Sequence, residues 1–368
     1  MRLDYNIAVG TSWSGLIDID KTLNDTEIRR TFAHLGDVSN GRLSWDKFNL
    51  MWVKLIVKKH ISPDDGSEFW IERANSRGIK KRDIDDAKSL DEIVQILGDA
   101  DYGKLAEEGG YERFYKPRDI SISDLYRSDS SGTTGAPKTV YHGISPLVFS
   151  ALDELVGILD RVPYERLTNK KLLCLGPGGA YQREHKELAD ILDMEYVDLS
   201  FSTKGLKNKS NEEVERIIGP VMKKTSEYLA EGNVGMMTGT PQVVYSLPKK
   251  FIENIDLIKL SGVGINAGEI KKLEDEFGRK GTKFLPMYGH FAGKSSIGKV
   301  NGDSIEYFPP YPFTIYSFDE AIGYGQSGRS RLIVAQPELL LIHPEDYGKK
   351  VKSDELFKGV DGLADPSR

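Results

Sequence analysis

The pattern of apolar and polar positions divides the chain into a helical beginning and a strand–helix continuation. Apolar residues recur at helical spacing across residues 44–60 and 89–97, and Ser44 is a plausible helix cap. The charged run Lys80–Asp86 between these two stretches is typical of solvated surface. We therefore expect residues 1–120 to form a mainly helical part of the protein.

From residue 121 to residue 308 the pattern changes to short apolar strands that alternate with helices. Strands are predicted at residues 171–175, 234–237, 257–260 and 284–287, and helices are predicted to start at Ser145-Pro146, after the turn Gly176-Pro177-Gly178-Gly179, at Thr240-Pro241 and near Ala267. Repeated strand–helix units predict a mostly parallel sheet covered by helices on both faces. Residues 309–368, with strands predicted at 313–318 and 331–335, are expected to form a small β region.

Composition excludes several classes of protein. The 368 residues include 50 Lys+Arg and 56 Asp+Glu, so the net charge of -6 disfavours a general nucleic-acid binder, which needs an excess of basic residues. The single cysteine excludes a disulfide framework and a cysteine-based metal cage. No apolar stretch approaches the roughly 20 residues that span a bilayer, and the N-terminus has no signal pattern. We expect a soluble cytoplasmic protein that binds neither nucleic acid nor membrane.

One segment has the composition of a phosphate-binding loop: Ser130-Ser131-Gly132-Thr133-Thr134-Gly135-Ala136-Pro137-Lys138. Its glycines let the backbone approach a ligand, and its hydroxyl and N–H groups can donate hydrogen bonds to phosphate oxygens. Lys138 adds a positive charge. A Walker A loop needs glycine immediately before the lysine, and Pro137 occupies that position, so a P-loop NTPase is disfavoured. A flexible polar loop is the alternative, but it does not account for so particular a run.

This run resembles the phosphate-binding signature S-S-G-T-T-G-x-P-K of the adenylate-forming superfamily, which includes acyl-CoA synthetases and adenylation domains. Further segments are similar to the phenylacetate-CoA ligase branch of that superfamily between about Phe69 and Asp346: Phe69-Trp70, Gly78-Ile79, the region of Ser89-Leu90, Ala267-Gly268-Glu269, Tyr288-Gly289, Gly323–Val334 and Asp346. In length the chain resembles short stand-alone members, such as the acyl-activating protein of phenazine antibiotic biosynthesis.

The resemblance implies an α/β fold: a large N-terminal domain with two helix-covered sheets in a layered αβαβα arrangement plus a small β region, without the mobile C-terminal domain. It implies binding of ATP and Mg²⁺ and activation of an organic carboxylic acid, aromatic acids included, for transfer to a thiol or amine. The residues implied in nucleotide binding are Ser130, Ser131, Gly132, Thr133, Thr134, Gly135, Lys138, Gly268, Glu269, Tyr288, Gly289 and Asp346, with Thr133, Thr134 and Lys138 in catalysis. His142 and His290 are candidates for the wall of the acid pocket.

The sequence departs from the family pattern at two points. Ala292 stands where the family places a glutamate that helps to hold magnesium, and the family's lysine-bearing C-terminal domain has no counterpart in residues 309–368. Two alternatives therefore stay open: a non-catalytic protein that binds a nucleotide or acyl-adenylate, and an adenylating subunit that needs a partner protein. Cys174, inside an apolar strand, is expected to be a core residue rather than a nucleophile.

Overall fold

The computed structural model describes residues 25–39, 41–98, 102–115, 122–130, 136–201, 209–261, 265–278, 281–319, 321–352 and 361–367. Its α-helices are α2 (Thr26–Ala33), α3 (Leu35–Ser39), α4 (Trp45–His60), α5 (Glu68–Arg77), α6 (Lys81–Asp86), α7 (Leu90–Leu97), α8 (Ile144–Leu159), α9 (Ala180–Ile191), α10 (Asn211–Glu231), α11 (Pro241–Ser246), α12 (Lys249–Ile252) and α13 (Ala267–Phe277). Short 3-10 helices lie at Gly103–Ala106, Gly110–Phe114, Ile122–Asp124 and Tyr164–Arg166.

The strands form one large sheet and one small hairpin. They are β1 (Tyr126–Asp129), β2 (Thr139–His142), β3 (Lys171–Gly176), β4 (Glu195–Ser200), β5 (Val234–Gly239), β6 (Leu257–Leu260), β7 (Lys283–His290), β8 (Lys294–Asn301), β9 (Ser304–Phe308), β10 (Thr314–Phe318), β11 (Ser327–Ala335), β12 (Leu340–Lys352) and β13 (Asp361–Ser367). The large sheet has the order β10-β11-β12-β13-β9-β8-β7-β6-β5-β3-β4, and β1 pairs with β2. Strand β7 pairs parallel to β6 and antiparallel to β8, so it belongs to both predicted sheets and joins them into one continuous sheet. The sheet therefore has a parallel half and an antiparallel half.

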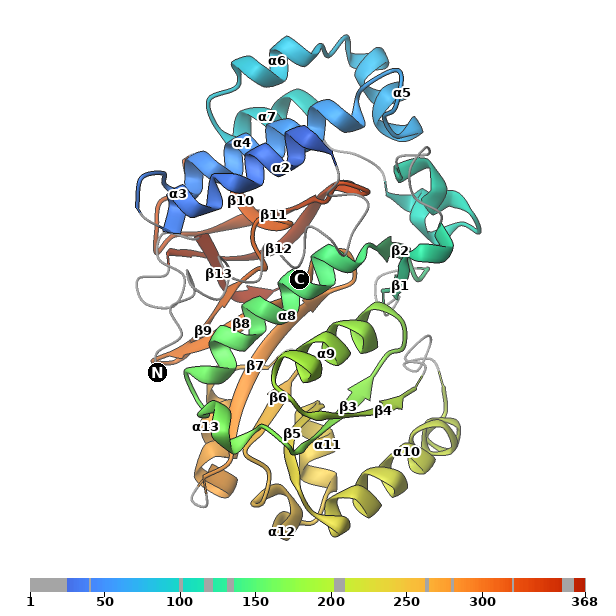
Figure 1. The fold of residues 1–368 in the computed structure, drawn as a ribbon, viewed down its shortest axis with the longest axis vertical. Coiled ribbons are helices and arrows are strands. Elements are labelled where there is room, and N and C mark those ends of the chain that lie inside the picture. The colour runs from blue at the N-terminus through green and yellow to red at the C-terminus, as the bar shows by residue number, and fades with distance from the viewer. Residues whose placement is uncertain are drawn as a thin grey trace.

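The parallel half, β3 to β7, is covered by helices on both faces (Figure 1). Side chains such as Leu172 and Met236 pack in one apolar cluster with α8 and α9. Their neighbours along the same strands, such as Leu173 and Met237, point to the opposite face and pack with α10 to α13. The strands are apolar along their whole length because both faces are buried.

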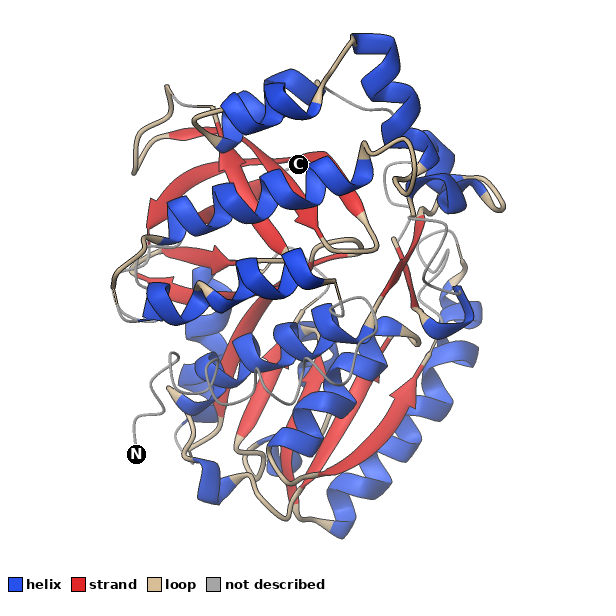
Figure 2. Ribbon diagram, turned by 45° about the horizontal axis from the view of Figure 1, so that its top comes forward, coloured by secondary structure: helices blue, strands red, loops and turns tan. Residues whose placement is uncertain are grey.

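The antiparallel half carries the N-terminal helices, which lie over β10, β11 and β12 in Figures 1 and 2. Two buried tryptophans fix this layer, because the indole N–H of Trp52 donates to the carbonyl of Ala335 and that of Trp70 to the carbonyl of Leu340, each over 2.8 Å. Phe149 of α8 also packs against this layer, with its ring 6.1 Å from that of Phe32. One continuous core therefore joins the helical beginning to the parallel half.

The layered α/β fold predicted from the sequence is confirmed, and so are its strands and most of its helices. The cap of α4 is Ser44, whose hydroxyl accepts from the N–H of Lys47, and β6 has the predicted bounds. The charges of the run Lys80–Asp86 are mostly exposed, as expected, and the run also contains a helix, α6, that buries Ile84. One detail was wrong. Helix α8 is capped by Gly143 rather than by Ser145, which is buried.

Within the described residues, no helix is both long and apolar enough to pass through a membrane.

Candidate functional site

The β1–β2 hairpin holds the two ends of the predicted phosphate loop together. The N–H of Ser130 donates to the carbonyl of Lys138 over 2.8 Å, and the N–H of Lys138 donates to the Ser130 hydroxyl over 2.7 Å. Below them, the Thr139 hydroxyl donates to Asp129 over 2.6 Å. Ser131, Gly132, Thr133, Thr134 and Gly135 lie outside the described residues. The structure therefore fixes where the loop leaves and rejoins the hairpin.

The glycine turn before α9 packs closely against strand β1 of this hairpin. Gly179 has a φ of 72°, a backbone conformation that favours glycine. A Cβ atom at this position would lie 2.3 Å from the carbonyl oxygen of Arg127 on β1, whereas one at Gly178 would meet nothing within 4 Å. Gly179 is thus required by the close approach of α9 to the hairpin, which favours the strand-to-helix turn over direct ligand contact.

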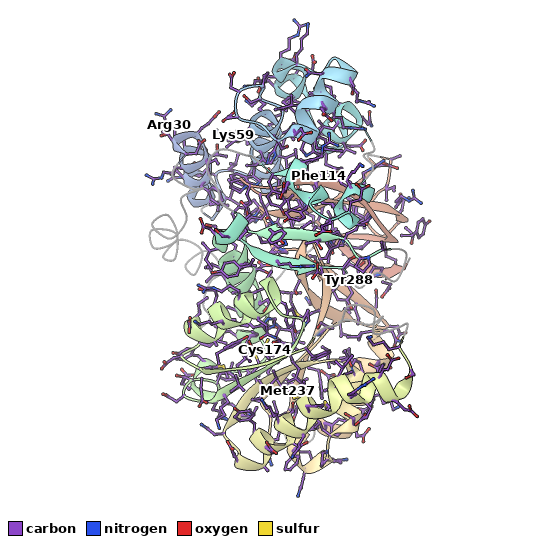
Figure 3. The ribbon with its side chains drawn as sticks, turned by 90° about the vertical axis from the view of Figure 1, so that its right-hand side faces the viewer. Arg30, Lys59, Phe114, Cys174, Met237 and Tyr288 are labelled. Carbon is purple, nitrogen blue, oxygen red and sulfur yellow. The ribbon has the colours of Figure 1, made fainter. Side chains whose placement is uncertain are left out.

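Tyr288, Gly289 and His290 form the last residues of β7. The Tyr288 ring is partly buried and lies 5.4 Å from the Tyr307 ring. Gly289 is exposed, and a Cβ atom there would meet nothing within 4 Å, so there is room beside the backbone. Figure 3 shows Tyr288 at the level of the β1–β2 hairpin, between the two halves of the molecule.

His290 and His142 are both engaged in holding the backbone. Nδ1 of His290 accepts from the N–H groups of Ala292 and Gly293, which closes the turn between β7 and β8. His142 is fully buried, with Nε2 3.1 Å from the carbonyl oxygen of Phe291 and Nδ1 3.1 Å from Oε1 of Gln336. Burial holds the pKa of His142 well below its ordinary value, so the ring is neutral at pH 7. This contact ties the end of the hairpin to the β7–β8 turn.

Gly268 and Glu269 lie in the first turn of α13. The helix is capped by Asn266, whose side-chain oxygen accepts from the N–H of Glu269 over 2.9 Å. Register pairs Gly239 with Leu260 and Leu260 with Pro286, so β5 and β6 end at one level of the sheet while β7 runs on to His290. The segments that carry Gly268 and Tyr288 therefore both extend beyond this edge, where ligands of parallel α/β sheets commonly bind.

Asp346 lies on β12, and its side chain is outside the described residues. The structure thus brings together the hairpin, the α9 turn and the ends of β6 and β7. For Asp346 the structure shows only that the residue belongs to strand β12.

Comparison with solved structures identifies the fold. The crystal structure of 2-hydroxyisobutyryl-CoA ligase, in complex with 2-HIB-AMP and CoA, superposes with a TM-score of 0.58 over 86% of this chain at 13% sequence identity. The chain shares its fold with this ligase. It spans 66% of the ligase's length, slightly less than two thirds.

Other similarities are weaker. VinN covers 98% of this chain at 13% identity and 90% of its own length with a TM-score of 0.42. The anthranilate CoA ligase AuaEII covers 68% of this chain at 10% identity and 48% of its own length with a TM-score of 0.39. These scores are too low to add to the assignment of the fold. No protein-family model matches the chain, and no curated protein matches it either.

A buried cluster of polar and charged side chains joins β6 to α8 and α9. Lys259 of β6 forms an ion pair with Glu154 of α8, and its Nζ lies 2.7 Å from Nε2 of His185 on α9. His185 therefore accepts at Nε2, and its Nδ1–H donates to the carbonyl of Tyr181 over 2.8 Å. Burial raises the pKa of Glu154 to about 8 and lowers that of His185 well below its ordinary value. The cluster holds α8 and α9 against the sheet.

Only a faint signal for this cluster is visible in the sequence. A lysine inside the apolar run Leu257–Leu260 and a glutamate inside the apolar helix 144–159 are each unusual, but their pairing depends on the packing of α8 on β6. Cys174, buried as predicted, lies nearby, and burial raises its thiol pKa far above the ordinary range. It is therefore protonated at pH 7 and a poor nucleophile.

Metal-binding side chains are not clustered in the described part of the chain. No group of three or more His, Cys, Asp or Glu side chains is placed to hold a metal ion in the described part of the chain. Ala292, where the family pattern has a glutamate, is fully buried in an apolar cluster with Val140 and Leu332. This position therefore offers neither an oxygen ligand nor access to water.

Proposed function

We propose that the protein binds ATP and activates an organic carboxylic acid as an acyl-adenylate, for transfer to a thiol or amine acceptor. One observation carries the proposal: the run 130–138 starts and ends on a hairpin beside the ends of the parallel strands, in a chain with the fold of a CoA ligase. The ligase with that fold contains an acyl adenylate, 2-HIB-AMP, together with CoA.

The proposed reaction places modest demands on the protein. A carboxylate oxygen of the acid attacks the α-phosphorus of ATP, and pyrophosphate leaves with the electron pair of the broken P–O bond. The acid is already an anion at pH 7, so no general base is needed. The difficulty is to align two anions, and the contribution of the protein is orientation and neutralisation of charge by cations and N–H groups.

The chain offers residues for each part of the nucleotide. The hydroxyls and N–H groups around Thr133 and Thr134, with the charge of Lys138, would hold the β- and γ-phosphates. The partly buried Tyr288 ring would stack on the adenine, beside the first turn of α13 with Gly268 and Glu269, and Asp346 would bind the ribose hydroxyls. Loss of one well-placed electrostatic group typically slows such a reaction by about 100- to 1000-fold.

The acid would lie on the other side of Gly289, where the backbone is open. His142 and His290 would shape this pocket, because their ring nitrogens already hold the β7–β8 turn. Similarity of the sequence to the phenylacetate-CoA ligase branch favours an aromatic acid. Any Mg²⁺ would be held by the ATP phosphates and water, since the described residues form no ligand set.

A second candidate function is binding of a nucleotide or acyl-adenylate without catalysis. The buried Ala292 favours it, because an alanine in an apolar cluster cannot help to hold a metal ion. An adenylating subunit that needs a partner protein for the second step is a variant of the main proposal.

Exchange of radiolabelled pyrophosphate into ATP, measured across arylacetates, benzoates and aliphatic acids, tests the proposal. Acid-dependent exchange with at least one acid is the expected result. Absence of exchange with every acid, in protein that still binds AMP, would favour the non-catalytic candidate. Absence of AMP binding would remove both.

A further inference from the structure

Lys294 is a buried lysine in an unusual backbone conformation. It is the first residue of β8, directly after the turn that joins β7 to β8, and its φ is 64°. This left-handed conformation is uncommon for residues other than glycine, so the fold holds a lysine where glycine would be easier. The side chain is nevertheless only 6% exposed.

Among the described residues Lys259 is buried too, and the ammonium group of Lys294 differs from that of Lys259. Lys259 is paired with Glu154 and His185. For Lys294, the described part of the chain shows neither an ion pair nor a side-chain hydrogen bond, although burial of an unpaired charge is unfavourable. A buried cation in this state is suited to an anionic partner that is not part of the described chain.

Four groups on three elements face Lys294. Two carboxylates, Glu184 of α9 and Glu338 of the β11–β12 turn, favour its charged form, while burial lowers its pKa to about 7. Both carboxylates are already engaged: Ser150 donates to Glu184, and the N–H of Gly143 donates to Glu338, each over 2.7 Å. The other two facing groups are the neutral rings of His142 on β2 and His185 on α9, whose pKa values Lys294 lowers further.

Lys294 also adjoins the candidate site. It pairs with His290 across the turn, and Ala292 is two residues before it. The turn is tied to the phosphate-loop hairpin through His142, whose Nε2 lies 3.1 Å from the Phe291 carbonyl oxygen. The ammonium group therefore belongs to the same corner of the molecule as Gly289 and the hairpin end.

We propose that the Lys294 ammonium group binds the carboxylate of the acid that the protein activates. The inference rests on the proposed function and adds to it the residue that recognises the acid. A charge-assisted hydrogen bond from Lys294 would orient the carboxylate and offset its negative charge as it approaches the α-phosphate. It would also supply the buried ammonium group with its partner.

Direct binding of two probes, [carboxyl-13C]acetate and [carboxyl-13C]benzoate, tests this by NMR titration of the full-length protein. Wild type should bind at least one probe, and Lys294→Met should weaken that binding at least tenfold. Lys294→Arg should stay within about threefold of wild type, because it keeps the charge. The matched control is Lys349→Met, which removes an exposed lysine on β12 and should change nothing.

Two further measurements separate the possible failures. Probe binding by wild type should weaken as the pH rises from 6 to 8.5, because Lys294 then loses its proton; this arm needs no variant to fold. AMP affinity, measured by calorimetry, should stay within twofold in all variants. Equal probe binding by wild type and Lys294→Met, or no probe binding by a wild type that binds AMP, would overturn the inference. Failure of wild type to bind AMP would overturn the proposed function instead.

Discussion

Replacement of Lys259 by methionine tests the buried charge cluster that holds α8 and α9 on the sheet. The side chains of Lys259 and Glu154 are 3% and 0% exposed, and the lysine also contacts His185. Methionine has nearly the same length and removes the charge without leaving a large cavity. Glu154 then loses its counter-charge in a place that water does not reach.

The expected loss of stability depends on pH. Removing one partner of a buried ion pair typically costs about 3–5 kcal/mol, a large part of the 5–15 kcal/mol that stabilises most proteins. The pKa of Glu154 is raised to about 8 by burial while Lys259 holds it down, so in the variant the pKa lies higher and the carboxyl group stays protonated at both pH 6 and pH 8.5. Above about pH 8 wild type can ionise Glu154 beside Lys259 and the variant cannot, so the loss should approach that range at pH 8.5 and be smaller at pH 6.

Urea denaturation at both pH values measures this loss. The double variant Lys259→Met/Glu154→Gln is the matched control, because it removes both charges and should recover at least 2 kcal/mol of the single-variant loss at pH 8.5. The reasoning is refuted if Lys259→Met loses under about 1 kcal/mol at pH 8.5. It is also refuted if the losses of Lys259→Met and Glu154→Gln, measured separately, add up to the loss of the double variant.

Two further predictions concern the hairpin and its surroundings. Gly179→Ala should destabilise the protein by more than about 1 kcal/mol and weaken ATP binding, because its φ is 72° and a Cβ atom would lie 2.3 Å from the Arg127 carbonyl oxygen. The control Gly178→Ala should be nearly neutral, since a Cβ atom there meets nothing within 4 Å. Thermal melts measure the stability of both variants, and calorimetry measures their ATP affinity. The folded-state pKa of His142 lies well below its unfolded value, so its contribution to stability is complete above about pH 6.5 and is lost as the pH falls. His142→Gln should therefore reduce the slope of stability against pH on the acid side by up to about 1.4 kcal/mol per pH unit. Urea denaturation at several pH values measures this slope, and an unchanged slope would count against the prediction.

Local features of the fold could be predicted from the sequence because they depend on neighbours in the chain. Ser44 caps α4 and Thr240 caps α11, each through a hydroxyl that accepts from an N–H three residues on. Residues 257–260 form β6 because a short, largely apolar run bounded by polar residues suits a strand buried on both faces.

Features that depend on distant contacts could not be predicted. The charged run that contains α6 shows one apolar residue, Ile84, and its helical state depends on burial of that residue against other helices. The continuation of the sheet through β7 depends on β8 reversing direction at a three-residue turn. No pattern in the sequence marks Lys294, because its burial and its left-handed backbone conformation depend on how β8 packs.

For the candidate site, the sequence indicated the loop and the residues around Tyr288, and the structure shows the frame that carries them. The hydrogen bonds between Ser130 and Lys138 explain how the loop is anchored. Assignment of each residue to a part of ATP stays a prediction.

Titration of ATP into the protein by calorimetry is the most direct test of the central claim that the loop between Ser130 and Lys138 binds the phosphates of ATP. Wild type should bind ATP saturably. A variant with Thr133, Thr134 and Lys138 all changed to alanine should bind at least tenfold more weakly while it keeps its thermal stability. Identical isotherms for the two proteins would contradict the account.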